Sequence, residues 1–318
     1  MRTLREITVE VIQKCNSNCI YCSSFSGKDS NHEICIDKLK EIALFSKEKG
    51  ASEINISGGE PFLKEDLLEY VFFINDLGLN VNIYTSGNFE LTQEIKKKLL
   101  NYSHKEKGSI IFNYCSCEPK VFNQIVADSN FGIENINENL MFFINSGYNV
   151  EVHTVPNVIN LDTLYNTAKN LKNMGVNKLR FLRMVYQARA KQNKEILEIK
   201  DNDKLLEIIN KIQTNLCDSE FSFKGGIPYS NYTKEQVSCN AGFNKLIIKY
   251  DGNVFPCEAF KEAPNKEEYI LGNIYNDQIE TIWKNYYQLA KLPQLKKFSK
   301  QYNEPCPAQI LYTGAINA

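Results

Sequence analysis

Three cysteines near the N-terminus are the residues of this sequence best suited to chemistry. Cys15, Cys19 and Cys22 lie in the run Cys-Asn-Ser-Asn-Cys-Ile-Tyr-Cys. Three thiolates this close can ligate three irons of a [4Fe–4S] cluster and leave the fourth iron open. An open position on a metal is where a substrate binds, as in catalytic zinc sites. The spacing therefore predicts a catalytic metal centre rather than a simple electron carrier.

Two other uses of these thiols are a structural zinc site and simple burial. Zinc in structural sites takes four protein ligands, but no fourth cysteine follows in this run, and His32 lies ten residues beyond Cys22. Buried cysteines also serve as small apolar side chains. The spacing alone favours the iron–sulfur cluster and leaves zinc open.

A second motif, Ser57-Gly58-Gly59-Glu60-Pro61, follows the cysteines after a predicted helix. The two motifs in this order resemble those of the radical S-adenosylmethionine (radical SAM) enzymes. Members of this family carry a Cys-x3-Cys-x2-Cys loop after the first strand and a Gly-Gly-Glu-Pro-type loop after the second. An aromatic residue usually precedes the last cysteine, and here it is Tyr21.

The resemblance implies cofactors and a reaction. The open iron would bind the amino and carboxylate groups of S-adenosylmethionine (SAM), and a flavodoxin- or ferredoxin-type protein would supply an electron. Reductive cleavage of the sulfonium would release methionine and a 5′-deoxyadenosyl radical, which abstracts a hydrogen atom from the substrate. The protein has to bind, orient and exclude water, because the cofactor carries the difficult chemistry.

The resemblance also indicates which residues bind SAM. Gly58 and Gly59 let the backbone approach a ligand closely and adopt positive φ. Glu60 resembles the family's acidic position beside the methionine ammonium, although it could equally cap a helix. Ser86 and Asn88 match the family's contacts to ribose or to the methionine carboxylate, although Ser-Gly-Asn is also ordinary turn sequence. Tyr21 and Pro61 are the remaining cofactor-binding candidates within the two motifs.

Four further candidates come from residue type and position. Arg183 and Arg189 follow the sixth predicted strand, and either could hold the cofactor carboxylate or an anionic substrate group, or be solvated. Cys115 and Cys117 lie two residues apart at a predicted strand end, so their side chains would share one face. A thiol there could donate a hydrogen atom to a substrate radical, which makes both candidate catalytic residues. Apolar filling is the alternative.

Short β-rich runs alternate with amphipathic helices over the first two thirds of the chain, which predicts an α/β fold with a parallel sheet. Six βα units match the partial (β/α)6 TIM-like barrel of the radical SAM family. In such barrels reactive groups gather at the carboxyl ends of the strands. The predicted strands are Ile7–Ile12, Glu53–Ser57, Asn80–Thr85, Ser109–Tyr114, Asn149–Val155 and Lys178–Met184, and the main helices are Asp37–Lys49, Lys64–Leu77, Ile136–Ser146 and Asp162–Met174.

The pattern changes after residue 215, which predicts a radical SAM core over residues 1–215 and a small α+β domain over residues 216–318. Two β-rich runs joined by Asp251-Gly252 predict a β-hairpin. The arrangement Cys239-x12-Gly252-x4-Cys257 resembles the start of the SPASM or twitch extension of radical SAM enzymes, which binds auxiliary Fe–S clusters.

This extension is shorter than a full SPASM domain. Only Cys306 follows, where a full segment has a longer series of cysteines. The resemblance therefore supports one auxiliary cluster with Cys239, Cys257 and Cys306 as ligands. A fourth ligand could be Cys217, Glu258 or the substrate itself.

The composition excludes several other classes of protein. The 318 residues carry 37 basic and 38 acidic side chains in mixed order, unlike the basic surface of a nucleic-acid-binding protein. The chain shows no signal peptide and no apolar stretch long enough to cross a bilayer. We therefore expect a cytoplasmic protein without nucleic-acid or membrane partners. Its ten cysteines are then ligands or free thiols rather than disulfides.

The sequence says least about the substrate. Relatives with this type of extension modify ribosomal peptides, oxidise protein side chains or act on sugars and nucleosides. The chain begins at its first strand, so we expect no N-terminal module for gripping a leader peptide, and a separate leader-peptide-binding protein would present a peptide substrate. We expect cross-linking, epimerisation or oxidation of a ribosomally made peptide. The alternatives are a small sugar, nucleoside or cofactor precursor as substrate, or a non-catalytic Fe–S electron carrier.

Overall fold

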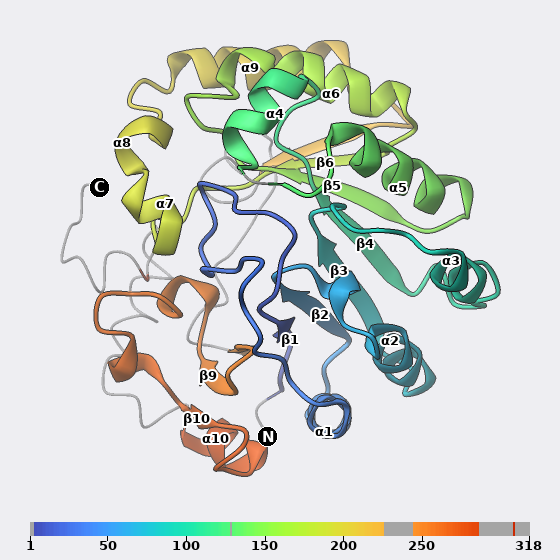
Figure 1. Ribbon diagram of the computed structural model, residues 1–318, viewed down its shortest axis with the longest axis vertical. Coiled ribbons are helices and arrows are strands. Elements are labelled where there is room, and N and C mark those ends of the chain that lie inside the picture. The colour runs from blue at the N-terminus through green and yellow to red at the C-terminus, as the bar shows by residue number, and fades with distance from the viewer. Residues whose placement is uncertain (1–2, 128, 226–243, 286–307, 309–318) are drawn as a thin grey trace. The chain divides into compact units, whose positions relative to one another are not determined.

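The computed structural model describes residues 3–127, 129–225, 244–285 and 308 (Figure 1). The chain divides into two compact units, and each is described here by itself. None of the described helices is long and apolar enough to span a bilayer. The first unit contains Met1–Lys14, Asp29–Ile83 and Ser238–Ala318, and the second unit contains Cys15–Lys28 and Tyr84–Val237.

The first unit is built on strands in the order β10-β9-β8-β1-β2-β3. β8, β1, β2 and β3 run parallel, and β9 is antiparallel to both of its neighbours. Helix α1 packs against α2 and α10. The elements are β1 (Glu6–Ile12), α1 (Ile36–Glu48), β2 (Glu53–Gly58), a 3-10 turn (Pro61–Leu63), α2 (Leu67–Asp76), β3 (Asn80–Thr85, whose last two residues belong to the second unit), β8 (Lys245–Ile248), β9 (Asn253–Phe255), 3-10 turns (Glu258–Phe260 and Lys266–Tyr269), β10 (Gly272–Asn273) and α10 (Ile279–Asn285).

The second unit contains four parallel strands in the order β4-β5-β6-β7. Helices separate the strands along the chain, as parallel pairing requires. The elements are α3 (Gln93–Leu100), β4 (Gly108–Asn113), α4 (Pro119–Ile125), α5 (Ile133–Asn145), β5 (Val150–Thr154), a 3-10 turn (Leu161–Thr163), α6 (Leu164–Asn173), β6 (Lys178–Phe181), α7 (Ala188–Gln192), α8 (Lys194–Leu197), α9 (Asp203–Asn215) and β7 (Ser222–Gly225).

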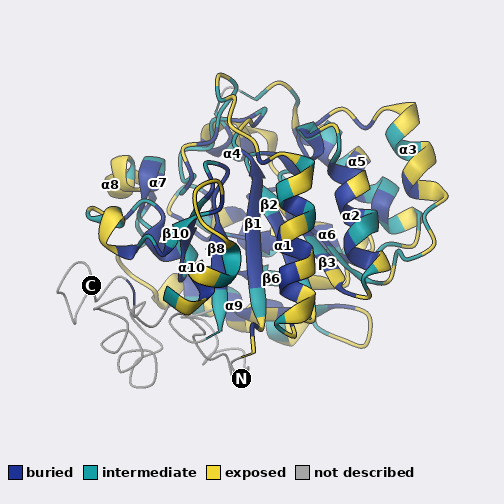
Figure 2. Ribbon diagram, turned by 90° about the horizontal axis from the view of Figure 1, so that it is seen from below, coloured by how far each residue is buried: buried dark blue, intermediate teal, exposed yellow. Residues whose placement is uncertain are grey.

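Helix α1 and strand β1 show how the sequence pattern sets the elements. In α1, Leu39, Ile42 and Ala43 are buried at helical spacing, and Gly50 follows the helix with φ +82°. Figure 2 shows α1 buried on one side and exposed on the other, whereas β1 is buried along almost its whole length. Burial on both faces is typical of a strand inside a parallel sheet.

The predicted fold is confirmed with small shifts of boundary. All six predicted strands form, and β8 and β9 make the predicted hairpin. β6 ends at Phe181 rather than Met184, and the helix expected from Lys64 begins at Leu67 because Pro61–Leu63 forms a separate turn first. Strand β7 was not predicted. The domain boundary at residue 215 stays a prediction.

One face of β1 carries polar side chains inside the first unit. These residues, Glu6, Thr8 and Glu10, alternate with apolar residues, and we call them the polar face of β1. Because side chains alternate along a strand, all three residues can make these contacts in only one register of β1 against its neighbour β8. The contacts come from one C-terminal segment: Lys245 Nζ lies 2.8 Å from Glu6 Oε1, Thr8 Oγ1 donates to Glu258 Oε1 at 3.0 Å, and Lys261 Nζ lies 2.5 Å from Glu10 Oε1.

The pair formed by Glu10 and Lys261 is the most deeply buried of these contacts. Glu10 is 1% exposed and Lys261 is 5% exposed. A buried charge is tolerated only when it is paired, because removal from water is otherwise very costly. Removing one partner of such a pair typically destabilises a protein by about 3–5 kcal/mol.

We therefore expect Lys261→Met to lower the free energy of unfolding by about 3 kcal/mol, because the Glu10 carboxylate stays buried without its cation. The double variant Glu10→Gln/Lys261→Met should recover much of this loss. Chemical denaturation followed by circular dichroism measures both. Lys98→Met is the matched control, since it breaks an exposed pair with Glu94 and should cost at most about 0.5 kcal/mol. Equal losses in the two single variants would contradict the expectation.

Candidate active site

The three predicted cluster ligands lie on residues 15–28 of the second unit, which we call the cysteine loop. Backbone hydrogen bonds fasten this loop to the end of α4. The N–H of Asn18 donates to the carbonyl of Ala127 at 2.9 Å, and the N–H of Ile20 donates to that of Ile125 at 3.0 Å. The last carbonyls of a helix lack partners within the helix. The cysteine loop supplies partners for α4 and is positioned by it.

Helix α7 holds the cysteine loop through side-chain donors. Arg189 Nε donates to the carbonyl of Cys19 at 2.9 Å, and its Nη2 donates to the carbonyl of Ser26 at 2.7 Å. Asn193 Nδ2 donates to the carbonyl of Ile20 at 3.0 Å. Hydrogen bonds from a charged donor are stronger than neutral ones. The structure thus gives Arg189 a positioning role, and its binding of a cofactor carboxylate stays a prediction.

Asn88 ties the turn after β3 to the same loop. Its side chain is fully buried, and Nδ2 donates to the hydroxyls of Ser17 and Ser129. Its carbonyl accepts from Asn16 Nδ2 at 3.0 Å. Ser86 Oγ accepts from the N–H of Asn88 at 3.1 Å, which is the expected turn geometry. Contacts of Ser86 and Asn88 with a cofactor stay predictions.

The three sulfurs of the cysteine loop differ in exposure. Cys15 is buried, and Cys19 and Cys22 are partly buried. The N–H of Ser24 donates to Cys22 Sγ at 3.4 Å. Burial and the nearby thiols of Cys22 and Cys115 hold the pKa of Cys19 well above its ordinary value, against the opposing charge of Arg189.

The donor set fits an iron–sulfur cluster by its chemistry. Cys15, Cys19 and Cys22 are soft sulfur donors in one anchored loop, and thiolates are the ligands of Fe–S clusters. The Ser24 N–H donates to Cys22 Sγ, and the Arg189 guanidinium partly opposes the burial that raises the pKa of Cys19. Across the described residues, no three His, Cys, Asp or Glu side chains are yet gathered closely enough to hold a metal ion.

Gly58 and Gly59 lie against the end of β1 in the first unit. A Cβ on Gly58 would lie 2.3 Å from the carbonyl oxygen of Ile12, and one on Gly59 would lie 2.1 Å from that of Lys14. Gly58 also has φ +146°. Only glycine fits at either position. The structure shows close approach of both glycines to the protein's own backbone at Ile12 and Lys14, and their contacts with a ligand stay predictions.

Glu60 is fully buried in this segment. Its N–H donates at 2.9 Å to the carbonyl of Lys14, the residue bonded to Cys15. Its Oε1 accepts from the N–H of Phe62 at 3.2 Å, so Glu60 caps the 3-10 turn Pro61–Leu63, whereas the helix that it was expected to precede begins only at Leu67. Contacts of Glu60 and Pro61 with a cofactor stay predictions.

Tyr21 lies in the cysteine loop of the second unit. Its hydroxyl donates to Asn113 Oδ1, at the end of β4, at 3.0 Å. Burial and the nearby thiols of Cys19, Cys115 and Cys22 hold the pKa of Tyr21 well above its ordinary value. The Tyr21 hydroxyl is therefore neutral, and its hydrogen bond joins the cysteine loop to the end of β4.

Cys115 and Cys117 do not extend from a strand, so the prediction that they share one face of a strand is wrong. β4 ends at Asn113, and both cysteines lie in the loop before α4. Burial raises the pKa of Cys115 to about 12, so its thiol keeps its hydrogen at neutral pH. Thr167 Oγ1 donates to Cys117 Sγ at 3.7 Å. A catalytic role for either residue stays a prediction.

Of the predicted auxiliary ligands, Cys239 and Cys306 lie outside the described residues. Cys257 follows the β8–β9 hairpin, and its thiol is partly buried in the first unit. Cys217 is a partly buried free thiol after α9 of the second unit, and burial raises its pKa. Their roles as ligands stay predictions.

Glu258 anchors the segment that carries Cys257. Its Oε1 accepts from Thr8 Oγ1 at 3.0 Å, and its Oε2 lies 2.9 Å from Lys245 Nζ. Cys257 Sγ lies 3.6 Å from the same Oε2. Both carboxylate oxygens are engaged, and these contacts hold Cys257 beside the polar face of β1. The alternative role of Glu258 as a fourth ligand stays a prediction.

Sequence analysis missed the residues that position these loops. Asn193 follows Arg189 by four residues, a spacing that places two side chains on one face of a helix and could have been noticed. Asn113, Thr8 and Lys245 carry no such signal, because their partners lie far away in the sequence.

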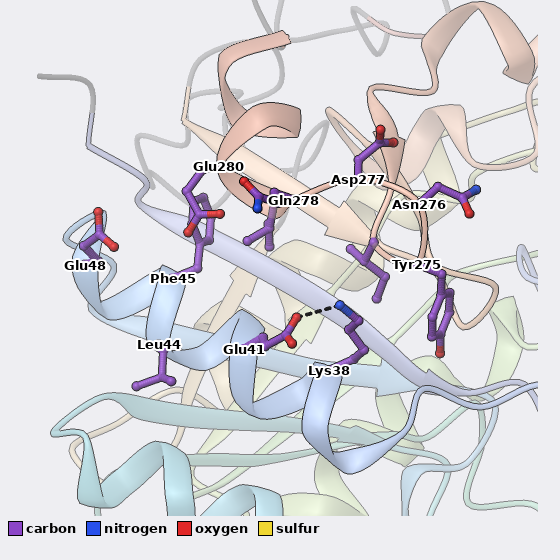
Figure 3. Close-up of a pocket in the computed structure, with 12 residues that line it drawn as sticks. Lys38, Glu41, Leu44, Phe45, Glu48, Tyr275, Asn276, Asp277, Gln278 and Glu280 are labelled. Carbon is purple, nitrogen blue, oxygen red and sulfur yellow. Dashed lines mark hydrogen bonds and ion pairs between the residues drawn. The ribbon is translucent and has the colours of Figure 1, made fainter.

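A surface pocket of about 640 Å³ lies between α1 and the segment Ile274–Glu280 in the first unit (Figure 3). In it, Lys38 Nζ lies 2.8 Å from Glu41 Oε2. Its other charged side chains, such as Glu48 and Asp277, are acidic. None of the predicted site residues lines this pocket, which distinguishes it from the candidate site.

Family comparisons agree with the two motifs of the sequence. Residues 9–213 match the model of the radical SAM superfamily, and residues 239–308 match SPASM, an iron–sulfur cluster-binding domain. A GTP 3′,8-cyclase of Sulfurovum sp. is 23% identical over 278 residues, which are 82% of each chain. The GTP 3′,8-cyclase of Helicobacter pylori is 23% identical over 98% of each chain.

Solved structures with the same fold include two enzymes bound to peptides. Streptococcus suis SuiB bound to the precursor peptide SuiA aligns with a TM-score of 0.71 at 13% identity, over 89% of this chain. The chain spans 65% of the SuiB chain. Native anSMEcpe with bound AdoMet and Kp18Cys peptide aligns with a TM-score of 0.66 at 17% identity, over 90% of this chain and 82% of that chain. These likenesses confirm the predicted partial barrel.

We expect Arg189→Met to lower the iron retained per chain after anaerobic purification, because the cysteine loop loses two charge-assisted hydrogen bonds worth about 1.5–3 kcal/mol each. Colorimetric iron analysis measures the loss. Lys191→Met is the matched control, since it changes an exposed side chain of the same helix. Equal iron in both variants would show that the Arg189 contacts do not hold the loop.

Proposed function

The chain belongs to the radical SAM superfamily, and we propose that Cys15, Cys19 and Cys22 ligate its [4Fe–4S] cluster and leave one iron open for SAM. As a radical SAM iron–sulfur enzyme it is not a simple electron carrier, which sets that alternative aside. The observation that supports the ligand assignment most strongly is the bond between the Glu60 N–H and the carbonyl of Lys14 at 2.9 Å. The second motif therefore contacts Lys14, the residue that precedes Cys15 in the chain.

The chain's own residues would prepare this site in separate ways. A cluster held by Cys15, Cys19 and Cys22 together with SAM would supply one-electron radical chemistry at a substrate carbon. Arg189 and Asn88 hold the loop that carries the thiolates. Glu60 is a buried acid that can pair with the methionine ammonium. Tyr21 adds a neutral side chain to the loop, held by its hydrogen bond to Asn113.

An auxiliary cluster belongs to the same proposal. The SPASM match covers Cys239, Cys257 and Cys306, which we assign as its protein ligands. Glu258 and Lys245 would hold the hairpin end that carries Cys257. Electrons would come from a flavodoxin- or ferredoxin-type donor protein.

We propose a ribosomally made peptide as substrate, with a separate leader-peptide-binding protein as a partner. The SPASM match over residues 239–308 supports this assignment, because such extensions accompany peptide modification. Anaerobic incubation with any short peptide that a neighbouring gene encodes, followed by mass spectrometry, tests it. A peptide that loses hydrogen or gains a cross-link only when SAM is present supports the assignment.

The second candidate substrate is a purine nucleotide. The GTP 3′,8-cyclases from Sulfurovum and Helicobacter pylori match most of this chain at 23% identity, which favours this candidate. Anaerobic incubation with GTP, SAM and reductant tests it. A GTP-dependent increase in 5′-deoxyadenosine would support the nucleotide, and unchanged GTP would exclude it.

We expect the anaerobically reconstituted protein to convert SAM to 5′-deoxyadenosine and methionine after reduction with dithionite, as liquid chromatography would detect. Cys19→Ala should reduce this product at least about a hundredfold, because one cluster ligand is lost. Cys35→Ala is the matched control, since that exposed thiol follows the cysteine loop in sequence but belongs to neither motif. Intact SAM alongside a fully loaded cluster would refute the proposed activity.

We expect Cys257→Ala and Cys306→Ala each to lower the iron content by up to four atoms per chain, because the auxiliary cluster loses a ligand. Cys217→Ala distinguishes the fourth-ligand alternatives, since it lowers iron only if Cys217 is a ligand. Iron content unchanged in Cys257→Ala and Cys306→Ala would remove the auxiliary cluster from the proposal.

A further inference from the structure

Three arginines lie between the start of β6 and the end of α7, and they differ in their hydrogen-bond partners. Arg180 Nε donates to Glu151 Oε1 at 3.1 Å. Arg189 donates to two carbonyls of the cysteine loop. Arg183 has buried Nε and Nη1 atoms, and neither has a hydrogen-bond partner among the described residues.

Two buried guanidinium nitrogens without a partner are unusual in Arg183, whose side chain as a whole is only partly buried. Buried N–H groups are almost always hydrogen-bonded, and buried charges are almost always paired, because both otherwise lose their hydration without compensation. Arg183 offers five donors and no acceptor. An oxyanion, either carboxylate or phosphate, is the partner that satisfies both its charge and its geometry.

The position of Arg183 agrees with ligand binding. It follows the end of β6 at Phe181, at the carboxyl edge of the parallel strands of the second unit. The next residue, Met184, belongs to an apolar cluster that packs against Ile20 and Tyr21 of the cysteine loop. Reactive and ligand-binding groups gather at this edge in α/β barrels.

We propose that Arg183 binds an oxyanion of a molecule that occupies the site beside the cysteine loop. The assignment rests on the proposed function, because it takes this loop to be the place where SAM and substrate meet. The oxyanion has two possible sources, the methionine carboxylate of SAM or an anionic group of the substrate. Arg183 therefore has a different role from Arg189, whose N–H groups donate to the cysteine loop and position it.

Arg183→Met tests the proposal without a measurement of turnover. In the ligand-free protein, purified anaerobically with its clusters, the variant should unfold at a higher temperature than the wild type, because two buried N–H donor atoms without partners are removed. A purely structural arginine would give the opposite shift. Lys178→Met is the control, since it removes an exposed charge from the same strand.

Calorimetric titration with SAM, with decarboxylated SAM and with inorganic pyrophosphate identifies the source of the oxyanion. Arg183→Met should lower the affinity for the ligand that carries the oxyanion by about 30-fold or more. Arg183→Lys should lower it by less, because lysine keeps the charge without the planar guanidinium. If the wild type prefers SAM to its decarboxylated form and the variant does not, the carboxylate of SAM is the partner. If only pyrophosphate binding is lost, the partner is a substrate phosphate.

If Arg183→Met binds all three ligands with the same affinity as the wild type, the inference is overturned, whatever the unfolding temperature shows. If Arg183→Met does not fold, Arg183→Lys and the same titrations decide. Failure of the proposed function looks different, since the ligands would still bind through Arg183 while no 5′-deoxyadenosine forms.

Discussion

The site depends on a backbone contact at the end of the first strand. The segment after β2 folds back onto the last residues before Cys15, so closely that a Cβ at Gly59 would lie 2.1 Å from a carbonyl oxygen. Two backbone hydrogen bonds, from Gly59 and Glu60, fix this approach at 2.7 and 2.9 Å. Because backbone atoms have no rotamer freedom, these bonds hold the segment that carries the buried acid Glu60 against Ile12 and Lys14 more firmly than side chains could.

The same strand also holds the C-terminal segment. Its polar face, Glu6, Thr8 and Glu10, binds Lys245, Glu258 and Lys261, while its end continues into the cysteine loop. β1 thus contacts the segment that carries Cys257 and leads directly to Cys15. Buried ion pairs add little net stability but penalise alternative registers strongly. The polar face therefore specifies how the C-terminal segment lies on β1 rather than making the fold stable.

The elements and motifs of this chain were predictable because they depend on local patterns. Strand alternation, helix spacing and the Asp251-Gly252 turn each lie within a few residues, and all six predicted strands formed. The uses of individual side chains were not predictable. Arg189 reaches Ser26 across 163 positions, and Glu258 reaches Thr8 across 250. The shared strand face expected for Cys115 and Cys117 failed because β4 stops at Asn113, before either cysteine.

The central claim is that the open iron held by Cys15, Cys19 and Cys22 binds SAM. Electron–nuclear double resonance on the reduced protein tests it directly, with SAM carrying 15N in its amino group and 17O in its carboxylate. The account predicts hyperfine coupling from both labels to the cluster, and its loss in Cys19→Ala. A fully loaded, reduced cluster that shows no coupling to either label would contradict the account.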